Sequence, residues 1–402
     1  MEQCQDDSAS TDRPSLPDDV VTKMMSFLAL DEDRKSAEAC KAWRTCWRRR
    51  CRGVLRLVCN NVGKFGYATH VTPRPGGGAI VVNYGNTRAN YGSLETYSPA
   101  GVLLGSCVVD FPGVPMPVHT GWCPKALAHR GDGTAWLLLG NDAEIVCVRM
   151  LSESSISAPI MKIEMIDWSS HNDDDSDDDD PLIRPEDIAL AGDVLLVLCY
   201  GSPFGNVVVF DNQTGARLRT FGSTGEDWRD QLRGPEALAV HEQYCFIADT
   251  HNQAIKVFDW RDGTFVNSFG KLQDQESAVK ALPGTEGNTY LRHYKHYWEW
   301  GDSFYRYHDD RKGNEPGEFD CPAGVAVRDG KLYVSEFRGC CIQVFRLPQD
   351  LGGSSALEQL QIIHSPDGDG LTGLCVEDGG RVWCMGPRLN PKNYVHMWEP
   401  YV

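Results

Sequence analysis

A short pattern of strands and turns recurs along this 402-residue chain and limits its fold more than any other feature. In the clearest copy, the apolar run 245–248 ends at Asp249, a polar turn follows, and a β-branched run returns at 255–258. An earlier run at 235–240 and a later one at 264–270 complete four short strands, which predict one antiparallel sheet. Because a lone sheet of this kind cannot bury both of its faces, the copies must stack against one another.

Further copies of the pattern extend it over most of the chain. Clear copies begin near Arg184 and Cys321, and weaker ones cover 79–97, 124–149 and 371–395, which makes six in all. We therefore predict a mainly β fold, a six-bladed β-propeller covering residues 53–402. The apolar run 54–58 has no blade of its own, so we expect it to close the last blade beside 394–398.

The net charge and the positions of the cysteines and histidines argue against several classes of function. The formal net charge of −17 argues against general nucleic-acid binding, which depends on clustered Lys and Arg. The 15 cysteines are scattered, often within apolar strands, so we expect buried reduced thiols and no metal site. Histidines fall mostly in turns rather than at a repeated inner-strand position, so we expect no catalysis, cofactor or metal; a metal-dependent propeller enzyme is the alternative.

The clearest copy of the repeat resembles a known family. Asp249, Asn252, the Ile255-x-Val257-Phe258 run and the closing Phe269-Gly270 are similar to the NHL repeat. The resemblance extends from about residue 66 to the end of the chain, with the blades near 184, 234 and 321 matching best. It implies a β-propeller built from NHL-like blades.

The head of the chain differs from the rest. Residues 1–14 are polar and without periodicity, which indicates a disordered tail, whereas 15–52 contain apolar residues at helical spacing. These helices resemble an F-box, most closely the auxin-receptor type, in Leu16-Pro17, in Ser26-Phe27-Leu28 and in Cys40-Lys41-x-Trp43-Arg44. The resemblance implies adaptor-binding residues at Leu16, Pro17, Val20, Val21, Met24, Leu28, Lys41 and Trp43. Packing of the same stripe against the propeller is the alternative.

The two resemblances together imply a function. We expect the substrate-recognition subunit of a Skp/cullin/F-box ubiquitin ligase, monomeric within its complex and without catalytic residues. Its expected partners are a Skp-type adaptor, the cullin ligase and a protein substrate. A ubiquitin-independent propeller scaffold that binds protein or RNA is the alternative. The polar N-terminus and the absence of a membrane-length apolar run predict a cytoplasmic or nuclear location.

Two segments interrupt the repeat. The acidic stretch 171–181 is expected to be an exposed loop, and Ser176 within it is a candidate phosphorylation site. The insertion 271–319 is rich in aromatic and basic residues of the kinds that dominate protein interfaces. A private mini-core or a surface for stacking RNA bases are the other interpretations of this insertion. The candidate substrate-binding residues are Tyr290, Tyr294, Tyr297, Trp298, Trp300, Tyr305, Arg306 and Tyr307.

Overall fold

The fold is seen in a computed structural model of the chain. It describes residues 55–65, 67–84, 92–111, 123–140, 144–165, 184–200, 207–224, 230–270, 317–353, 357–366, 368–386 and 393–400. Residues Leu55–Pro400 form one compact unit.

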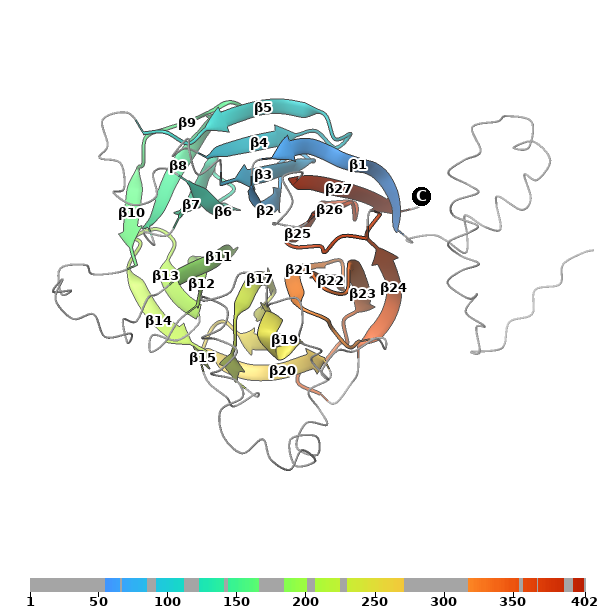
Figure 1. Cartoon of the computed structure of the whole chain (residues 1–402). Helices are drawn as coiled ribbons and strands as arrows, with labels where there is room; N and C mark the ends of the chain where they lie inside the picture. Colours follow the sequence, from blue (N-terminus) through green and yellow to red (C-terminus); the bar gives the residue numbers. More distant parts are fainter. Residues whose placement is uncertain are drawn as a thin grey trace, which may run out of the picture. The chain divides into compact units, whose positions relative to one another are not determined.

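Six antiparallel sheets are arranged in a ring, each with its first strand nearest the centre (Figure 1). Short strands rich in Val, Ile, Leu and Phe alternate with Gly, Asp and Asn turns, which is the pattern that builds such blades. Blade 1 consists of β2 (Ala68–Pro73), β3 (Ala79–Asn83), β4 (Ser93–Tyr97) and β5 (Leu103–Val108). Blade 2 consists of β6 (Pro124–His129), β7 (Thr134–Leu139), β8 (Glu144–Ser152), β9 (Ser155–Ile156) and β10 (Met161–Glu164). Blade 3 consists of β11 (Arg184–Ala191), β12 (Val194–Tyr200), β13 (Val207–Asp211) and β14 (Arg217–Phe221).

The second half of the ring repeats this arrangement, with a small parallel pair of strands between blades 3 and 4. That pair is β15 (Ser223–Thr224) with β16 (Gln231–Leu232), and blade 4 consists of β17 (Pro235–His241), β18 (Tyr244–Asp249), β19 (Ala254–Asp259) and β20 (Thr264–Gly270). Blade 5 consists of β21 (Pro322–Arg328), β22 (Lys331–Glu336), β23 (Cys341–Arg346) and β24 (Glu358–His364). Blade 6 consists of β25 (Leu374–Val376), β26 (Val382–Met385), β27 (Asn393–Pro400) and β1 (Leu55–Phe65).

Strand β1 closes the ring. It pairs antiparallel with β27, with Leu55 opposite Pro400 and Leu57 opposite Trp398, so the two ends of the propeller share blade 6. The Gln361 side chain fastens the start of β1, because it accepts a hydrogen bond from the Leu55 amide at 2.9 Å and donates one to the Leu55 carbonyl at 3.1 Å. This pairing confirms the closure predicted from the apolar run 54–58.

Apolar cores lie where neighbouring blades pack face to face. One core joins blades 2 and 3 through Trp136, Leu195 and Phe210, and another joins blades 1 and 6 through Tyr97 and Trp383. The two buried tryptophans also use their indole N–H groups. Trp136 Nε1 donates to Asn212 Oδ1 and Trp383 Nε1 to Glu377 Oε1, both at 2.6 Å, which satisfies polar groups that burial would otherwise penalise.

Blade 4 contains a buried ion pair. Lys256 Nζ lies 3.1 Å from Asp249 Oδ2, and both side chains are 0% exposed. The Arg233 amide and the Asn252 side chain also donate hydrogen bonds to the Asp249 carboxylate, each at 2.6 Å. The pair therefore fastens the second and third strands of the blade to the segment that enters it.

Comparison with the sequence predictions gives a mixed outcome. The mainly β, six-bladed propeller is confirmed, and the eleven cysteines of the described part are free thiols, nine of them buried. Within that part no helix is long and apolar enough to cross a bilayer. The predicted helical head, the acidic stretch and residues 271–316 of the aromatic insertion lie outside the described residues, so these remain predictions.

Candidate functional site

The inner strands of five blades share one irregularity. Pairing with the second strand shifts by one residue near the start of β2, β6, β11, β17 and β21, so one extra residue bulges from each inner strand. The residue directly after each bulge therefore occupies an equivalent level of the ring. These residues are His70, Ala126, Asp187, Ala237 and Gly324.

Two of the five residues at this level are ionisable, and they meet. His70 Nδ1 of blade 1 lies 3.1 Å from Asp187 Oδ1 of blade 3, although blade 2 separates these strands. Blade 2 contributes only Ala126 at the same level, and this small side chain leaves room for the contact. The other three residues at this level are Ala or Gly, so His70 and Asp187 are the two that can ionise.

The Asp187 carboxylate is held in place. Its Oδ2 accepts a hydrogen bond from the Leu238 amide and its Oδ1 one from the Ile188 amide, both at 2.9 Å. These two hydrogen bonds fix the position of the Asp187 carboxylate, and the carboxylate in turn orients the His70 ring through the contact at Nδ1. The His70 side chain is 18% exposed, against 8% for Asp187, so the histidine is the more accessible member.

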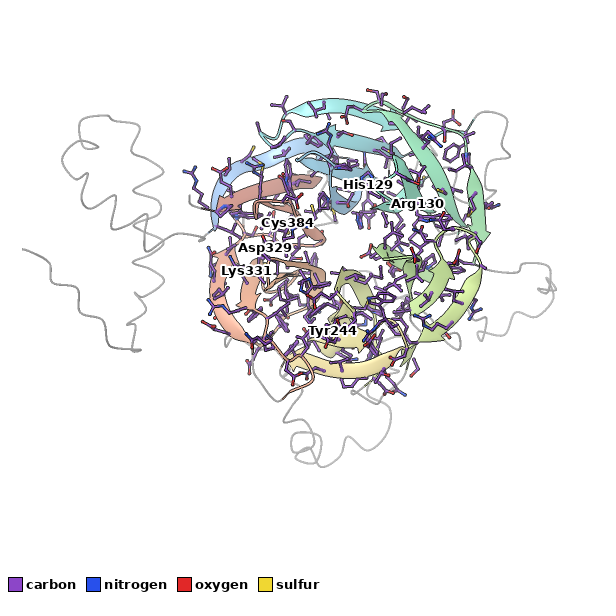
Figure 2. All side chains as sticks on the ribbon, turned by 180° about the vertical axis from the view of Figure 1, so that it is seen from behind. His129, Arg130, Tyr244, Asp329, Lys331 and Cys384 are labelled. Carbon is purple, nitrogen blue, oxygen red and sulfur yellow. The ribbon has the colours of Figure 1, made fainter. Side chains whose placement is uncertain are left out.

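A second histidine lies near the pair. His129 ends β6 and lies toward the inner side of the ring (Figure 2). Burial, and secondarily the nearby charge of His70, lowers the pKa of His129 to about 4, so its imidazole is neutral at pH 7. Its Nε2 is buried and has no hydrogen-bond partner among the residues that the structure describes. We call His70, His129 and Asp187 the axial cluster.

A charged pair lies one residue before this level. Lys125 and Glu186 are the bulged residues of β6 and β11, and Lys125 Nζ lies 2.8 Å from Glu186 Oε2. The same ammonium donates to the Pro185 carbonyl at 2.9 Å. Each side chain is 19% exposed. The surroundings of the axial cluster are thus polar, which suits a polar small molecule better than an apolar one.

None of the predicted site residues contributes to this cluster. The adaptor-binding residues from Leu16 to Trp43, Ser176, and the substrate-binding residues from Tyr290 to Tyr307 lie outside the described residues. The sequence analysis placed most histidines in turns and so missed His70 and His129 on inner strands. In the described part of the chain, no group of three or more His, Cys, Asp or Glu side chains is arranged to hold a metal ion.

Comparison with known protein families supports the predicted NHL repeat in one blade. The model of the NHL repeat matches residues 319–345, which span blade 5 from before β21 to within β23. A search of curated protein sequences found no match.

Solved structures that resemble the chain include three enzymes. A gluconolactonase from Xanthomonas campestris aligns with a TM-score of 0.49 at 12% identity, covering 87% of this chain and 92% of its own. The PQQ-bound aldose sugar dehydrogenase from Streptomyces coelicolor aligns with 0.49 at 13%, covering 87% and 98%. A streptogramin B lyase aligns with 0.48 at 10%, covering 86% and 97%.

These comparisons correct the function expected from the sequence. The expectation of a non-catalytic substrate receptor in a ubiquitin ligase is wrong: the similar structures include a lactonase, a dehydrogenase and a lyase, and the matching family model covers only an NHL repeat. The F-box resemblance had carried that expectation, and its residues lie outside the described part.

Proposed function

We propose that this protein is a propeller enzyme that performs acid–base chemistry on a small polar molecule at the axial cluster. The observation that carries the proposal is the 3.1 Å contact between His70 and Asp187 at a level where the other bulged strands have only Ala or Gly. A carboxylate at Nδ1 fixes the orientation of an imidazole and leaves Nε2 to exchange a proton with a substrate. His70 would therefore act as the general base or acid, and Asp187 would position it.

His129 supplies a different property. Because its imidazole is neutral at pH 7, it can donate or accept a hydrogen bond without adding a charge. A neutral imidazole of lowered pKa can polarise a carbonyl oxygen as a hydrogen-bond donor. His70 and His129 would thus divide the work that acyl hydrolysis needs, since one activates water and the other stabilises the oxygen where negative charge develops.

Hydrolysis of small lactones and aryl acetates is the reaction to test first. Proton release in a pH-stat would be followed for the full chain and for His70→Gln, Asp187→Asn and His129→Gln. His364→Gln, at an exposed position on β24, is the matched control. We expect His70→Gln to reduce kcat/KM by at least about 100-fold, because positioned proton transfer contributes roughly that much.

Two readouts separate a catalytic role from a structural one. Thermal unfolding should leave His70→Gln near wild type, whereas Asp187→Asn should lower both the midpoint and kcat because Asp187 also accepts the Leu238 amide. Hydrolysis that survives His70→Gln unchanged, or a wild-type chain no faster than this variant on every probe, would refute the proposed function.

We also propose that the protein is located in the cytoplasm or the nucleus. Imaging of the tagged full chain in cells would test it.

A further inference from the structure

The contact between His70 and Asp187 joins two blades that are not neighbours. His70 lies on β2 of blade 1 and Asp187 on β11 of blade 3, and β6 of blade 2 lies between them in the ring (Figure 1). The 3.1 Å separation of His70 Nδ1 and Asp187 Oδ1 is a hydrogen-bond distance, whereas a separation of about 3.6 Å would not be one. The contact therefore needs β11 to be held at a set distance from blade 1.

The strand that carries Asp187 is not fixed at this point by its own sheet. Pairing of β11 with β12 shifts between Pro185 and Asp187, so Glu186 has no residue opposite it. A bulged residue of this kind interrupts the ladder of hydrogen bonds and lets the strand bend. Contacts from the neighbouring blades must therefore set the position of β11 beside Asp187.

Both neighbouring blades supply such a contact. From blade 4, the Leu238 amide donates to Asp187 Oδ2 at 2.9 Å. From blade 2, Lys125 Nζ donates to the Pro185 carbonyl at 2.9 Å and lies 2.8 Å from Glu186 Oε2. Lys125 thus contacts the main chain and the side chain of the two residues that directly precede Asp187.

The surroundings of Lys125 favour a holding role over a substrate-binding one. The Lys125 and Glu186 side chains are each 19% exposed, and an ion pair partly removed from water is screened less than one on the open surface. Cys199, which lies opposite Pro185, is 1% exposed and belongs to the core that joins blades 2 and 3. The ammonium uses two of its three donors on β11, and Glu186 balances its charge.

We infer that Lys125 is a positioning residue of the axial cluster. By holding Pro185 and Glu186, its ammonium keeps Asp187 Oδ1 within hydrogen-bond distance of His70 Nδ1. The neutral His70 ring then carries its proton on Nδ1 and presents Nε2 to a substrate. The effect on catalysis rests on the proposed function, whereas the state of the His70 ring can be measured without any substrate.

The first test is ¹⁵N NMR of the full chain labelled at histidine, at about pH 8.5, where an ordinary imidazole is neutral. The chain has 11 histidines, so the His70 signals are identified as those that disappear in His70→Gln. The wild type should show the Nδ1–H form of His70. Lys125→Met should shift His70 toward the Nε2–H form, because Asp187 no longer stays within reach of Nδ1.

Two further variants separate position from charge. Lys125→Met/Glu186→Gln removes the pair without changing the net charge and leaves no unpaired carboxylate, so it decides the outcome even where the single variant unfolds. It should change His70 as Lys125→Met does. Lys125→Arg keeps a cation that can donate to both acceptors and should restore the Nδ1–H form.

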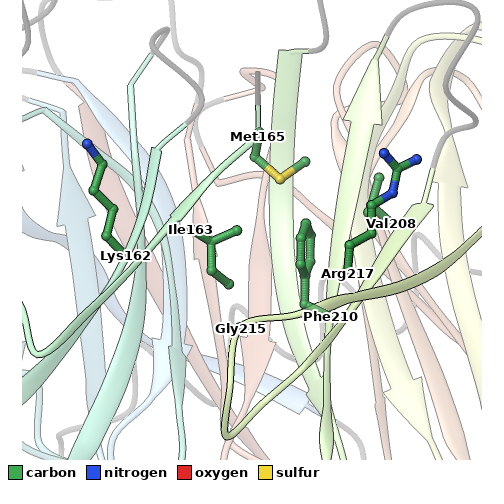
Figure 3. Close-up of a pocket in the computed structure, with 7 residues that line it drawn as sticks. All are labelled: Lys162, Ile163, Met165, Val208, Phe210, Gly215 and Arg217. Atoms are coloured by element: carbon green, nitrogen blue, oxygen red, sulfur yellow. The ribbon is translucent and has the colours of Figure 1, made fainter. Parts of the chain in front are cut away.

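Lys162→Met is the matched control. Lys162 Nζ lies 2.7 Å from Glu144 Oε1. Lys162 belongs to β10, the outermost strand of the same blade, where it lines a cleft between blades 2 and 3 (Figure 3). Its loss removes a paired lysine from blade 2 far from β11 and should leave the His70 signals unchanged.

Hydrolysis of the lactone and aryl acetate probes gives the second readout. Lys125→Met and the double variant should lower kcat at least about tenfold with KM unchanged, because a misplacement of about 1 Å can cost about 100-fold. A wild-type chain without hydrolysis would refute the proposed function but leave the NMR comparison standing.

Thermal unfolding shows which variants are folded, and three results would overturn the inference. The first is a folded double variant in which His70 keeps the Nδ1–H form. The second is an absence of any recovery in Lys125→Arg. The third is a raised KM with an unchanged His70 ring after loss of Lys125, which would make Lys125 a substrate contact instead.

Discussion

The buried neutral His129 makes a quantitative prediction about stability at low pH. Burial lowers its pKa to about 4 in the folded chain, against an ordinary value of 6.5. Between these two values the unfolded chain binds a proton that the folded chain does not, so stability falls as pH decreases through this window. The loss attributable to His129 is about 2 kcal/mol between pH 7.5 and pH 5.

Urea unfolding of the wild type and of His129→Gln at both pH values measures this loss. Other groups also titrate over the range, including His251, whose pKa burial lowers to about 4, but they contribute equally to both chains and cancel. We expect the wild type to lose about 2 kcal/mol more than His129→Gln, whereas the exposed control His364→Gln should follow the wild type. Equal losses in the wild type and His129→Gln would show that His129 is not a buried neutral histidine.

Three further predictions concern the scaffold. Lys256→Met leaves the Asp249 carboxylate buried without its partner and should cost about 3–5 kcal/mol in urea unfolding; a cost below about 1 kcal/mol would contradict the buried pair. Gly78→Ala should lower the unfolding midpoint by more than Gly133→Ala, because an added Cβ at Gly78 would lie 2.0 Å from the Tyr97 carbonyl oxygen. At Gly133 an added Cβ meets nothing within 4 Å, and both positions have positive φ, so the pair differs in the steric contact. Equal unfolding midpoints would refute the steric cause. A chain starting at residue 66 lacks β1 and exposes the edge of β27, so it should lose the cooperative thermal transition that a chain starting at residue 53 retains.

The propeller fold was predictable because short stretches of sequence determine each of its strands and turns. Each blade repeats a polar turn between two apolar runs, as at Asp249 and the run 255–258, and such patterns determine strands over a few residues. The closing strand was predictable for a related reason, since the apolar run 54–58 needed a partner that the first blade did not supply. Cysteines such as Cys147 and Cys245 lie in apolar strands and are buried as expected.

The axial cluster was not predictable from local patterns because its members come together only when the ring closes. His70 and Asp187 are 117 positions apart and meet across blade 2. The copy of the repeat predicted near residue 79 also began one strand late, so β2 and its histidine were left out. The sequence did contain a signal for this level of the ring. In four blades a proline directly precedes the bulged residue, at Pro124, Pro185, Pro235 and Pro322. Aligning the repeats with Ala68 at the proline position puts His70 and Asp187 at the same position of the repeat.

Chemical rescue of a His70→Ala variant tests the central claim most directly. The substrate would be the lactone or aryl acetate that the wild type hydrolyses fastest, and the measurement is kcat/KM with and without added imidazole. If His70 exchanges a proton with the substrate, the variant should lose at least about 100-fold and imidazole should restore part of that loss. A variant that keeps full activity, or an inactive but folded variant that imidazole leaves inactive, would contradict catalysis by the axial cluster.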